Sequence, residues 1–186
     1  MFFPSQLAAL MGENQYKDKE EEFKCFVERH VTGKPSIIED CEIPEKYNAF
    51  MEKHIHAEQS TRIKRKVDNL SCSEEIKAEM LKKIYTSRGN LNEAVAIKMY
   101  EDEHDVVVQK PTHFMKKHII KNNKEFFIGG KIDGMITNNH KVSVVEVKNR
   151  QNHFFTEIPE YERIQIECYM RLLNAHECIF IQHFEQ

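Results

Sequence analysis

Two short segments in the second half of the chain carry residue types that could hold a metal ion beside a phosphate ester. In the first, Ile128, Ile132 and Ile136 share one face of a predicted strand and Asp133 lies on the other; the second reads Val144-Val145-Glu146-Val147-Lys148. Side chains alternate between the two faces of a β-strand, so Glu146 and Lys148 share one face. If the two segments pair as a hairpin, Asp133 approaches both of them. The pattern therefore predicts two carboxylates and one ammonium group on adjacent strands.

This arrangement favours metal-assisted hydrolysis. Two carboxylates this close repel each other unless a proton or a cation lies between them. Oxygen ligands suit Mg²⁺, with Mn²⁺ as the alternative. Such an ion lowers the pKa of a bound water and neutralises charge that builds up on a phosphodiester. Lys148 would orient that water or stabilise the transition state. The competing interpretation is an exposed strand face with a single cross-strand ion pair, since a Glu-x-Lys pattern alone is common by chance.

Strands and a helix must position these groups. The residue pattern predicts strands at 126–136 and 142–148 with a turn at 137–140, a helix at 159–174 and a last strand at 178–181. Helices are expected at 5–10, 19–31, 74–85 and 90–101, and a short β-type run at 106–108. The polar stretch 36–70 has no clear order. Helices followed by strands, a helix and a strand predict an α/β fold (mixed α+β), with a central mixed β-sheet flanked by helices.

Length and composition place the chain among soluble globular domains. Its 186 residues suffice for one domain, and 40% are hydrophobic and 31% charged. We expect a single domain over 1–186, divided into N-terminal helices (1–35), a variable helical insertion (36–75) and a catalytic core (76–186). No apolar run reaches the length of a membrane span. Five cysteines without C-x-x-C spacing disfavour a disulfide framework or a zinc cluster and favour a reducing intracellular compartment.

The charge distribution indicates a nucleic-acid partner less clearly than the motifs do. The formal net charge is -3, so a nucleic-acid contact would rest on local basic patches. The candidates are 62–66 and 116–124, although solvated surface is the common interpretation of such runs. His54 and His56 could bind a metal, but we expect them to be exposed helical histidines.

The segments with Asp133 and Glu146-Val147-Lys148 resemble the signature of the PD-(D/E)XK nucleases. Gln165 and Tyr169, four residues apart on one helix face, match the Q-x-x-x-Y motif of the RecB-like and lambda-exonuclease-like branches. The resemblance implies a restriction-endonuclease-like core, with the Val147 carbonyl as a further metal ligand. It also implies that Gln165 positions Lys148 or the scissile phosphate. The alternative for Tyr169 is packing in the core, as for Cys168.

Two further segments narrow the resemblance to the lambda-exonuclease/YqaJ-type viral recombination nucleases. Residues 3–16 resemble the opening of that branch, where the serine lies by a bound 5′-phosphate; Ser5 would take this role here, or act only as a helix N-cap. Residues 87–93 resemble the G-x-x-x-E helix of the branch, whose glutamate supports the metal site. This implies a metal role for Glu93, whereas Asn90 and Glu93 also fit a capping box. Further substrate contacts are expected from Arg88, Lys131 and Tyr169.

Together these features predict a Mg²⁺-dependent deoxyribonuclease, specifically a 5′→3′ exonuclease in DNA recombination or repair. Its partners would be double- or single-stranded DNA with a free end, further copies of the chain or a recombination protein, and no membrane. One alternative is a structure-selective endonuclease of the same superfamily, similar to a junction resolvase. Another is a non-catalytic DNA-binding module that kept the fold.

Overall fold

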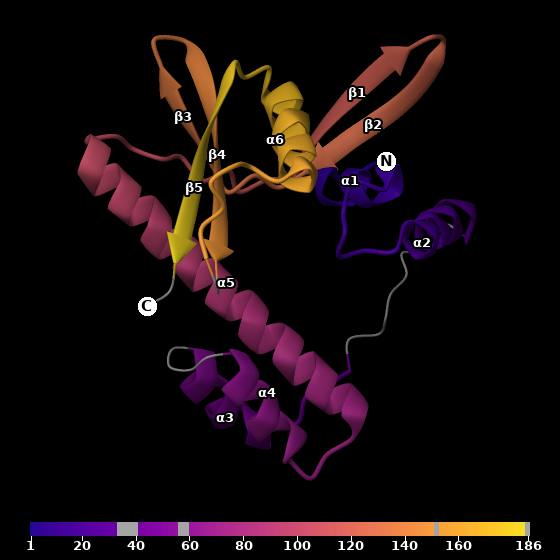
Figure 1. Cartoon of the computed structure of the whole chain (residues 1–186), viewed down its shortest axis with the longest axis vertical. Coiled ribbons are helices and arrows are strands. Elements are labelled where there is room, and N and C mark those ends of the chain that lie inside the picture. The colour runs from indigo at the N-terminus through magenta and orange to yellow at the C-terminus, as the bar shows by residue number, and fades with distance from the viewer. Residues whose placement is uncertain (33–40, 56–59, 151–152, 185–186) are drawn as a thin grey trace.

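The computed structural model describes residues 1–32, 41–55, 60–150 and 153–184. Its elements follow one another as shown in Figure 1: α1 (Pro4–Met11), α2 (Lys19–Thr32), η1 (Glu45–Tyr47), α3 (Asn48–Ile55), α4 (Ser60–Asp68), α5 (Glu74–His104), β1 (Met115–Lys121), β2 (Lys124–Gly130), β3 (Gly134–Asn138), β4 (Lys141–Arg150), α6 (Glu160–Leu173) and β5 (Glu177–Phe184).

A three-stranded mixed sheet forms the centre of the molecule, in the order β3-β4-β5. β3 pairs with β4 in antiparallel fashion, and β4 pairs with β5 in parallel. Helix α5 contributes Ala96 to a core cluster with Val145 and Val147, and α6 contributes Tyr169 to a second cluster with Val144. Because Val144 and Val145 point to opposite faces, α5 and α6 cover opposite faces of the sheet. The predicted mixed sheet with helical flanks is confirmed.

A separate hairpin of β1 and β2 projects from the body beside α1 and α6 (Figure 1). The single strand predicted over 126–136 is therefore wrong, since β2 ends at Gly130 and β3 starts in the other sheet. The packing explains the glycine at the end of β2: a Cβ on Gly130 would lie 2.8 Å from the Tyr169 ring. The run 106–108 is not a strand, although Gln109 forms an isolated bridge with Met135. Strand β1 was not predicted.

Helix α5 is a single helix of 31 residues, where two helices were predicted. The Ser73 side chain caps its start by accepting a hydrogen bond from the Ile76 amide, and Asp105 ends it in the left-handed conformation. Gly89 lies within the helix, where one glycine costs about 1 kcal/mol. Packing against apolar clusters on both sides of Gly89 outweighs that cost. The capping box considered as the alternative role for Asn90 and Glu93 is therefore excluded, because both residues lie inside α5.

The first half of α5 packs with η1, α3 and α4 into a small helical module, at the bottom of Figure 1. Its core comprises Ile43, Met51, Ile63, Val67, Met80 and Ile84. His54 is buried with 4% of its surface exposed and meets the Phe50 ring edge-on, so the expectation of an exposed histidine is wrong. His54 lies on α3, and the packing of α3 against α5 in this module buries it. His56 lies outside the described residues.

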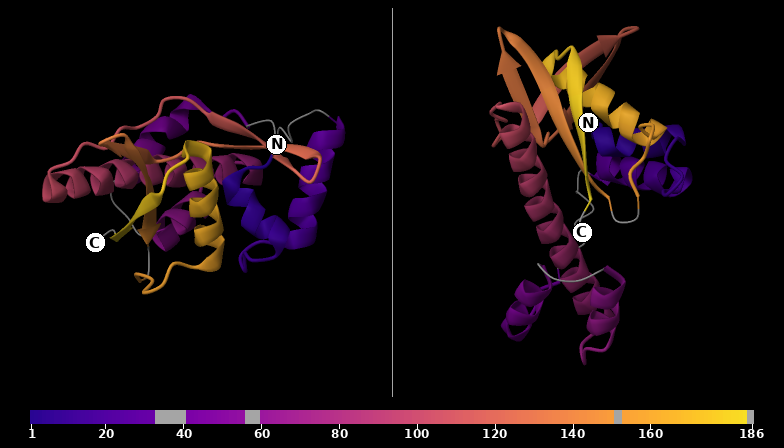
Figure 2. Two further views of the ribbon diagram at one scale, coloured as in Figure 1. Left: turned by 90° about the horizontal axis from the view of Figure 1, so that it is seen from above. Right: turned by 60° about the vertical axis from the view of Figure 1, so that its left-hand side comes forward.

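Helix α1 packs against α6, and α2 packs against α1, as the views of Figure 2 show. Phe3 precedes α1 without any side-chain cap, and Pro4 occupies its first turn, so the alternative N-cap role of Ser5 is wrong. Gly12 ends α1 with φ 84°, at the predicted position. Phe26 of α2 stacks on Phe2, whereas Phe23 remains exposed. The sequence Thr32-Gly33-Lys34-Pro35 also predicts a turn, which falls largely outside the described residues.

All five cysteines are free thiols. Across the described ranges, no helix combines the length and apolar character needed to cross a membrane.

Candidate active site

The antiparallel pairing of β3 and β4 brings Asp133 to Glu146. Asp133 immediately precedes β3, and Gly134 pairs with Val145, the residue before Glu146. The Val147 amide donates a 2.8 Å hydrogen bond to Asp133 Oδ2, which fixes the carboxylate beside β4. The convergence expected from strand alternation is therefore present in the structure, although Asp133 itself lies in the short connection before β3.

Glu146 is the most buried carboxylate of this group, with 1% of its surface exposed. Its Oε1 accepts a 2.7 Å hydrogen bond from Lys148 Nζ, while its Oε2 has no hydrogen-bond partner among the described residues. Burial raises the pKa of Glu146 to about 7; Lys148 opposes this rise and Asp133 adds to it. A buried carboxylate oxygen without a partner is costly, and a bound cation would remove that cost.

A chain of hydrogen bonds connects this carboxylate to α6. Lys148 Nζ also donates to Gln165 Oε1 at 3.1 Å, and Gln165 Nε2 donates to Tyr169 Oη at 3.2 Å. Tyr169 is only 6% exposed and belongs to the core cluster below the sheet, and burial raises the pKa of its hydroxyl. Tyr169 thus packs in the core and at the same time orients Gln165, which holds the lysine in place.

Glu93 lies on α5 and takes a different partner. Its Oε1 accepts a hydrogen bond from Lys110, a residue that the sequence patterns did not single out. Burial raises the pKa of Asp133, and the nearby charge of Glu93 adds to the rise, so the two carboxylates are close enough to interact. However, the parts of the chain that the structure describes contain no group of three or more His, Cys, Asp and Glu side chains that could hold a metal ion.

The packing of the sheet explains why Glu93 stays apart. Helix α5 covers the face of β4 that carries Val145 and Val147, whereas Glu146 projects from the opposite face, toward α6. Two carboxylates, Asp133 and Glu146, therefore form the centre, with Glu93 as a neighbour across the sheet.

A cavity of about 620 Å³ adjoins this centre at the start of α1. Its lining includes Ser5, Tyr169 and three cationic side chains, Lys17, Arg29 and Lys131. Arg29 donates to Gln6 Oε1 at 3.2 Å and Lys17 pairs with Glu22 at 2.7 Å, so both cations are held in place. The predicted residues Ser5 and Lys131 thus lie together.

The remaining predicted contact, Arg88, lies on α5 near Tyr85 and does not line that cavity. Lys17 and Arg29 were missed because they reach the cavity through the packing of α2 on α1, which no local pattern encodes.

A buried ion pair joins β4 to α6 behind the site. Arg150 donates to both Glu162 carboxylate oxygens, at 2.7 and 2.6 Å, and its Nε donates to Gln182. Glu162 lies three residues before Gln165, so the pair fixes the helix turn from which Gln165 reaches Lys148. Sequence patterns gave no signal for this pair, because its partners are far apart in the chain.

The mixed sheet between two helices, with Asp133, Glu146 and Lys148 on its central hairpin, defines the PD-(D/E)XK class of nucleases. Within this class, residues 4–175 match the model of the YqaJ-like viral recombinase domain, and the chain belongs to that family. The resemblance seen in the sequence is therefore confirmed. The family match identifies the chain as a nuclease of recombination.

Comparisons with solved structures and with curated proteins add nothing to this assignment. The crystal structure of SSO0001 is 15% identical and superposes with a TM-score of 0.45, over 76% of this chain and 73% of that one. No curated protein matches the chain.

Proposed function

We propose that the chain is a divalent-metal-dependent deoxyribonuclease that digests DNA from a 5′ end. The observation that carries the metal dependence is Glu146 Oε2, a buried carboxylate oxygen without a hydrogen-bond partner among the described residues, close to a second carboxylate. Membership of a recombination nuclease family supports DNA as the substrate.

The donor set fits Mg²⁺ or Mn²⁺. Asp133 and Glu146 would hold the ion, with the Val147 carbonyl as a further ligand, and all three donors are oxygens. Glu93 would bind through a water or accept a second ion after releasing Lys110. A divalent ion held there supplies an activated water and neutralises charge on the phosphodiester.

Lys148 is oriented for a transition-state contact. Its ammonium group has three donors, of which one serves Glu146 and one serves Gln165. The third remains for the attacking water or a phosphate oxygen. Because Gln165 and the buried carboxylate fix the side chain beforehand, little reorganisation is needed during the reaction.

The cavity beside α1 supports action from a 5′ end. Ser5 lies in the first turn of α1, at the positive end of the helix dipole, which attracts an anion. Pro4 has no amide hydrogen and the Gln6 amide donates to the Phe3 carbonyl, so the contact would come from the Ser5 hydroxyl and its own amide. Arg29 and Lys131 add positive charge around the same space, beside Lys17, which is paired with Glu22. A terminal phosphate bound there would lie a fixed distance from Asp133 and Glu146, as an exonuclease requires.

Four labelled DNAs test the proposal. Linear duplexes with a 5′-phosphate or a 5′-hydroxyl, a linear single strand and a closed circle are incubated with Mg²⁺ and with EDTA. We expect Mg²⁺-dependent release of nucleotides from linear DNA, fastest for the 5′-phosphorylated duplex, and an intact circle. Cleavage of the circle would instead indicate an endonuclease, and no cleavage of any substrate would indicate a non-catalytic DNA-binding module.

A further inference from the structure

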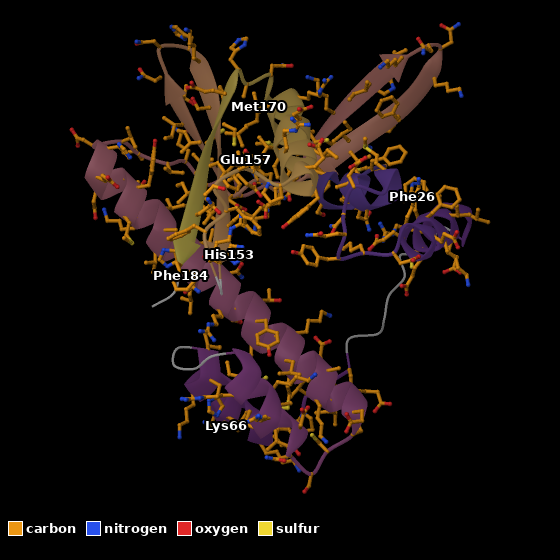
Figure 3. The ribbon with its side chains drawn as sticks, viewed as in Figure 1. Phe26, Lys66, His153, Glu157, Met170 and Phe184 are labelled. Atoms are coloured by element: carbon orange, nitrogen blue, oxygen red, sulfur yellow. The ribbon has the colours of Figure 1, made fainter. Side chains whose placement is uncertain are left out.

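Helix α4, in the helical module, combines a buried apolar face with an unusually basic outer surface. Ile63 and Val67 are fully buried against α5, and Arg62, Lys64, Arg65 and Lys66 are all exposed. In nine residues the helix has four cationic side chains and one acidic side chain, within a chain whose net charge is -3. Figure 3 shows Lys66 at the outer surface of the module, away from the sheet.

Three of the four cations form one stripe. Arg62, Arg65 and Lys66 are spaced i, i+3 and i+4, so they share a helix face, whereas Lys64 lies on the opposite flank. Within the described ranges, neither Arg62 nor Arg65 forms an ion pair with an acidic side chain. Arg62 and Arg65 therefore concentrate positive charge without an acidic partner on one face of α4.

The other basic segment of the chain, the β1–β2 hairpin, differs in this respect. Lys117 donates to the Arg171 carbonyl and to the Asn174 side chain at the end of α6. Lys116 lies over the Phe127 ring at 4.0 Å, and His118 contacts Glu125. The cations at the base of the hairpin thus serve contacts within the protein, which makes α4 the better candidate for an external anion.

Helix α5 holds the stripe at a fixed distance from the active site. Ile63 and Val67 pack in one cluster with Met80 and Ile84 of α5. The Asn149 side chain, on β4, donates a 3.1 Å hydrogen bond to the Gly89 carbonyl, which ties the middle of α5 to the catalytic sheet.

The component of that separation along α5 follows from helix geometry. Glu93, the active-site neighbour on α5, follows Met80 and Ile84 by thirteen and nine residues. At 1.5 Å per residue this is about 14–20 Å along the helix, or roughly four to six base pairs of DNA.

We propose that Arg62 and Arg65 of α4 bind the phosphate backbone of the DNA substrate, outside the active site. Cations without neighbouring aromatic rings suit phosphates rather than bases, and α4 contains no aromatic residue. The contact is therefore independent of sequence and holds the duplex that trails behind the bound end. This inference rests on the proposed function, since it takes DNA as the ligand.

The salt dependence of binding tests the proposal. The wild type and an Arg62→Gln/Arg65→Gln variant are titrated with a 5′-phosphorylated duplex in EDTA, by fluorescence anisotropy over a series of salt concentrations. Each lost phosphate contact lowers the slope of log K against log[salt] by about 0.9, so we expect a decrease of about 2. A Lys121→Gln/Lys124→Gln variant at the hairpin tip removes the same charge and should keep the wild-type slope. An unchanged slope in the α4 variant, or an equal decrease in both variants, would overturn the proposal.

Neutral methylphosphonate linkages locate the contact. Placed roughly four to six nucleotides from the bound 5′ end, they should weaken binding of the wild type and have no further effect on the α4 variant. Equal weakening of both proteins would show that another surface contacts those phosphates, against the proposal. Because these measurements need no cleavage, failure of the nuclease proposal would appear separately, as wild-type protein that binds DNA and does not cut it.

Discussion

Replacing Glu146 by glutamine should stabilise the folded protein at alkaline pH in the absence of metal. Burial raises the pKa of this carboxyl group from 4.5 to about 7. A raised pKa means that the folded state binds the proton more tightly than the unfolded state. The associated stability is complete below about pH 4.5 and is lost as the pH rises through about 7. The full loss is about 3 kcal/mol, at 1.36 kcal/mol per pKa unit.

Glutamine has nearly the same shape but no charge to bury, so it avoids this loss. It also deprives Lys148 of its ionic partner, although its amide oxygen can still accept the hydrogen bond. We therefore expect the Glu146→Gln variant to exceed the wild type in unfolding free energy by about 1–3 kcal/mol at about pH 8, and to differ little at about pH 5.

Urea unfolding in EDTA at the two pH values measures the effect, with Glu167→Gln as a matched control. Glu167 lies exposed on α6, so its substitution should leave the pH dependence unchanged. Mg²⁺ should then raise the stability of the wild type at alkaline pH, because it binds only the folded state, and should do so far less in the Glu146→Gln variant. A glutamine variant that is less stable than the wild type at alkaline pH would refute the reasoning.

Three other substitutions probe the site and its support. Lys148→Ala should lower kcat on the order of 100-fold with a smaller change in DNA affinity; single-turnover rates at saturating enzyme decide this, and a loss confined to affinity would make Lys148 a binding residue. Ser5→Ala should slow digestion of 5′-phosphorylated duplex more than that of 5′-hydroxyl duplex, and equal slowing in paired initial rates would contradict a phosphate contact. Glu162→Gln leaves Arg150 charged and buried, so it should cost about 3–5 kcal/mol in a denaturant titration, whereas an Arg150→Met/Glu162→Met variant should recover much of that loss. A double variant as unstable as the single one would show that the pair itself contributes the stability.

The sequence predicted the centre of the site because the relevant rule is local. Strand alternation placed Glu146 and Lys148 on one face, and helix periodicity placed Gln165 and Tyr169 together. The same rules predicted α2 and α6 nearly to the residue. These elements have uninterrupted patterns bounded by turn residues or proline.

What the sequence did not reveal depends on tertiary packing. The glycine at position 130 is required by the close approach of Tyr169, and Gly89 remains helical because apolar clusters pack on both sides of it. The basic side chains around the cavity and the partner of Glu93 come from segments distant in the chain. No spacing rule connects such residues before the fold is known.

The central claim is that Asp133 and Glu146 hold the divalent ion that hydrolyses DNA. The most direct test compares the wild type with Asp133→Asn on 5′-phosphorylated linear duplex, measuring nucleotide release with Mg²⁺ and the heat of Mg²⁺ binding by calorimetry. We predict that the wild type binds the ion and releases nucleotides only when it is present. The variant should fold and bind DNA, but lose most of both signals. An Asp133→Asn variant that binds Mg²⁺ and cleaves DNA as the wild type does would contradict the claim.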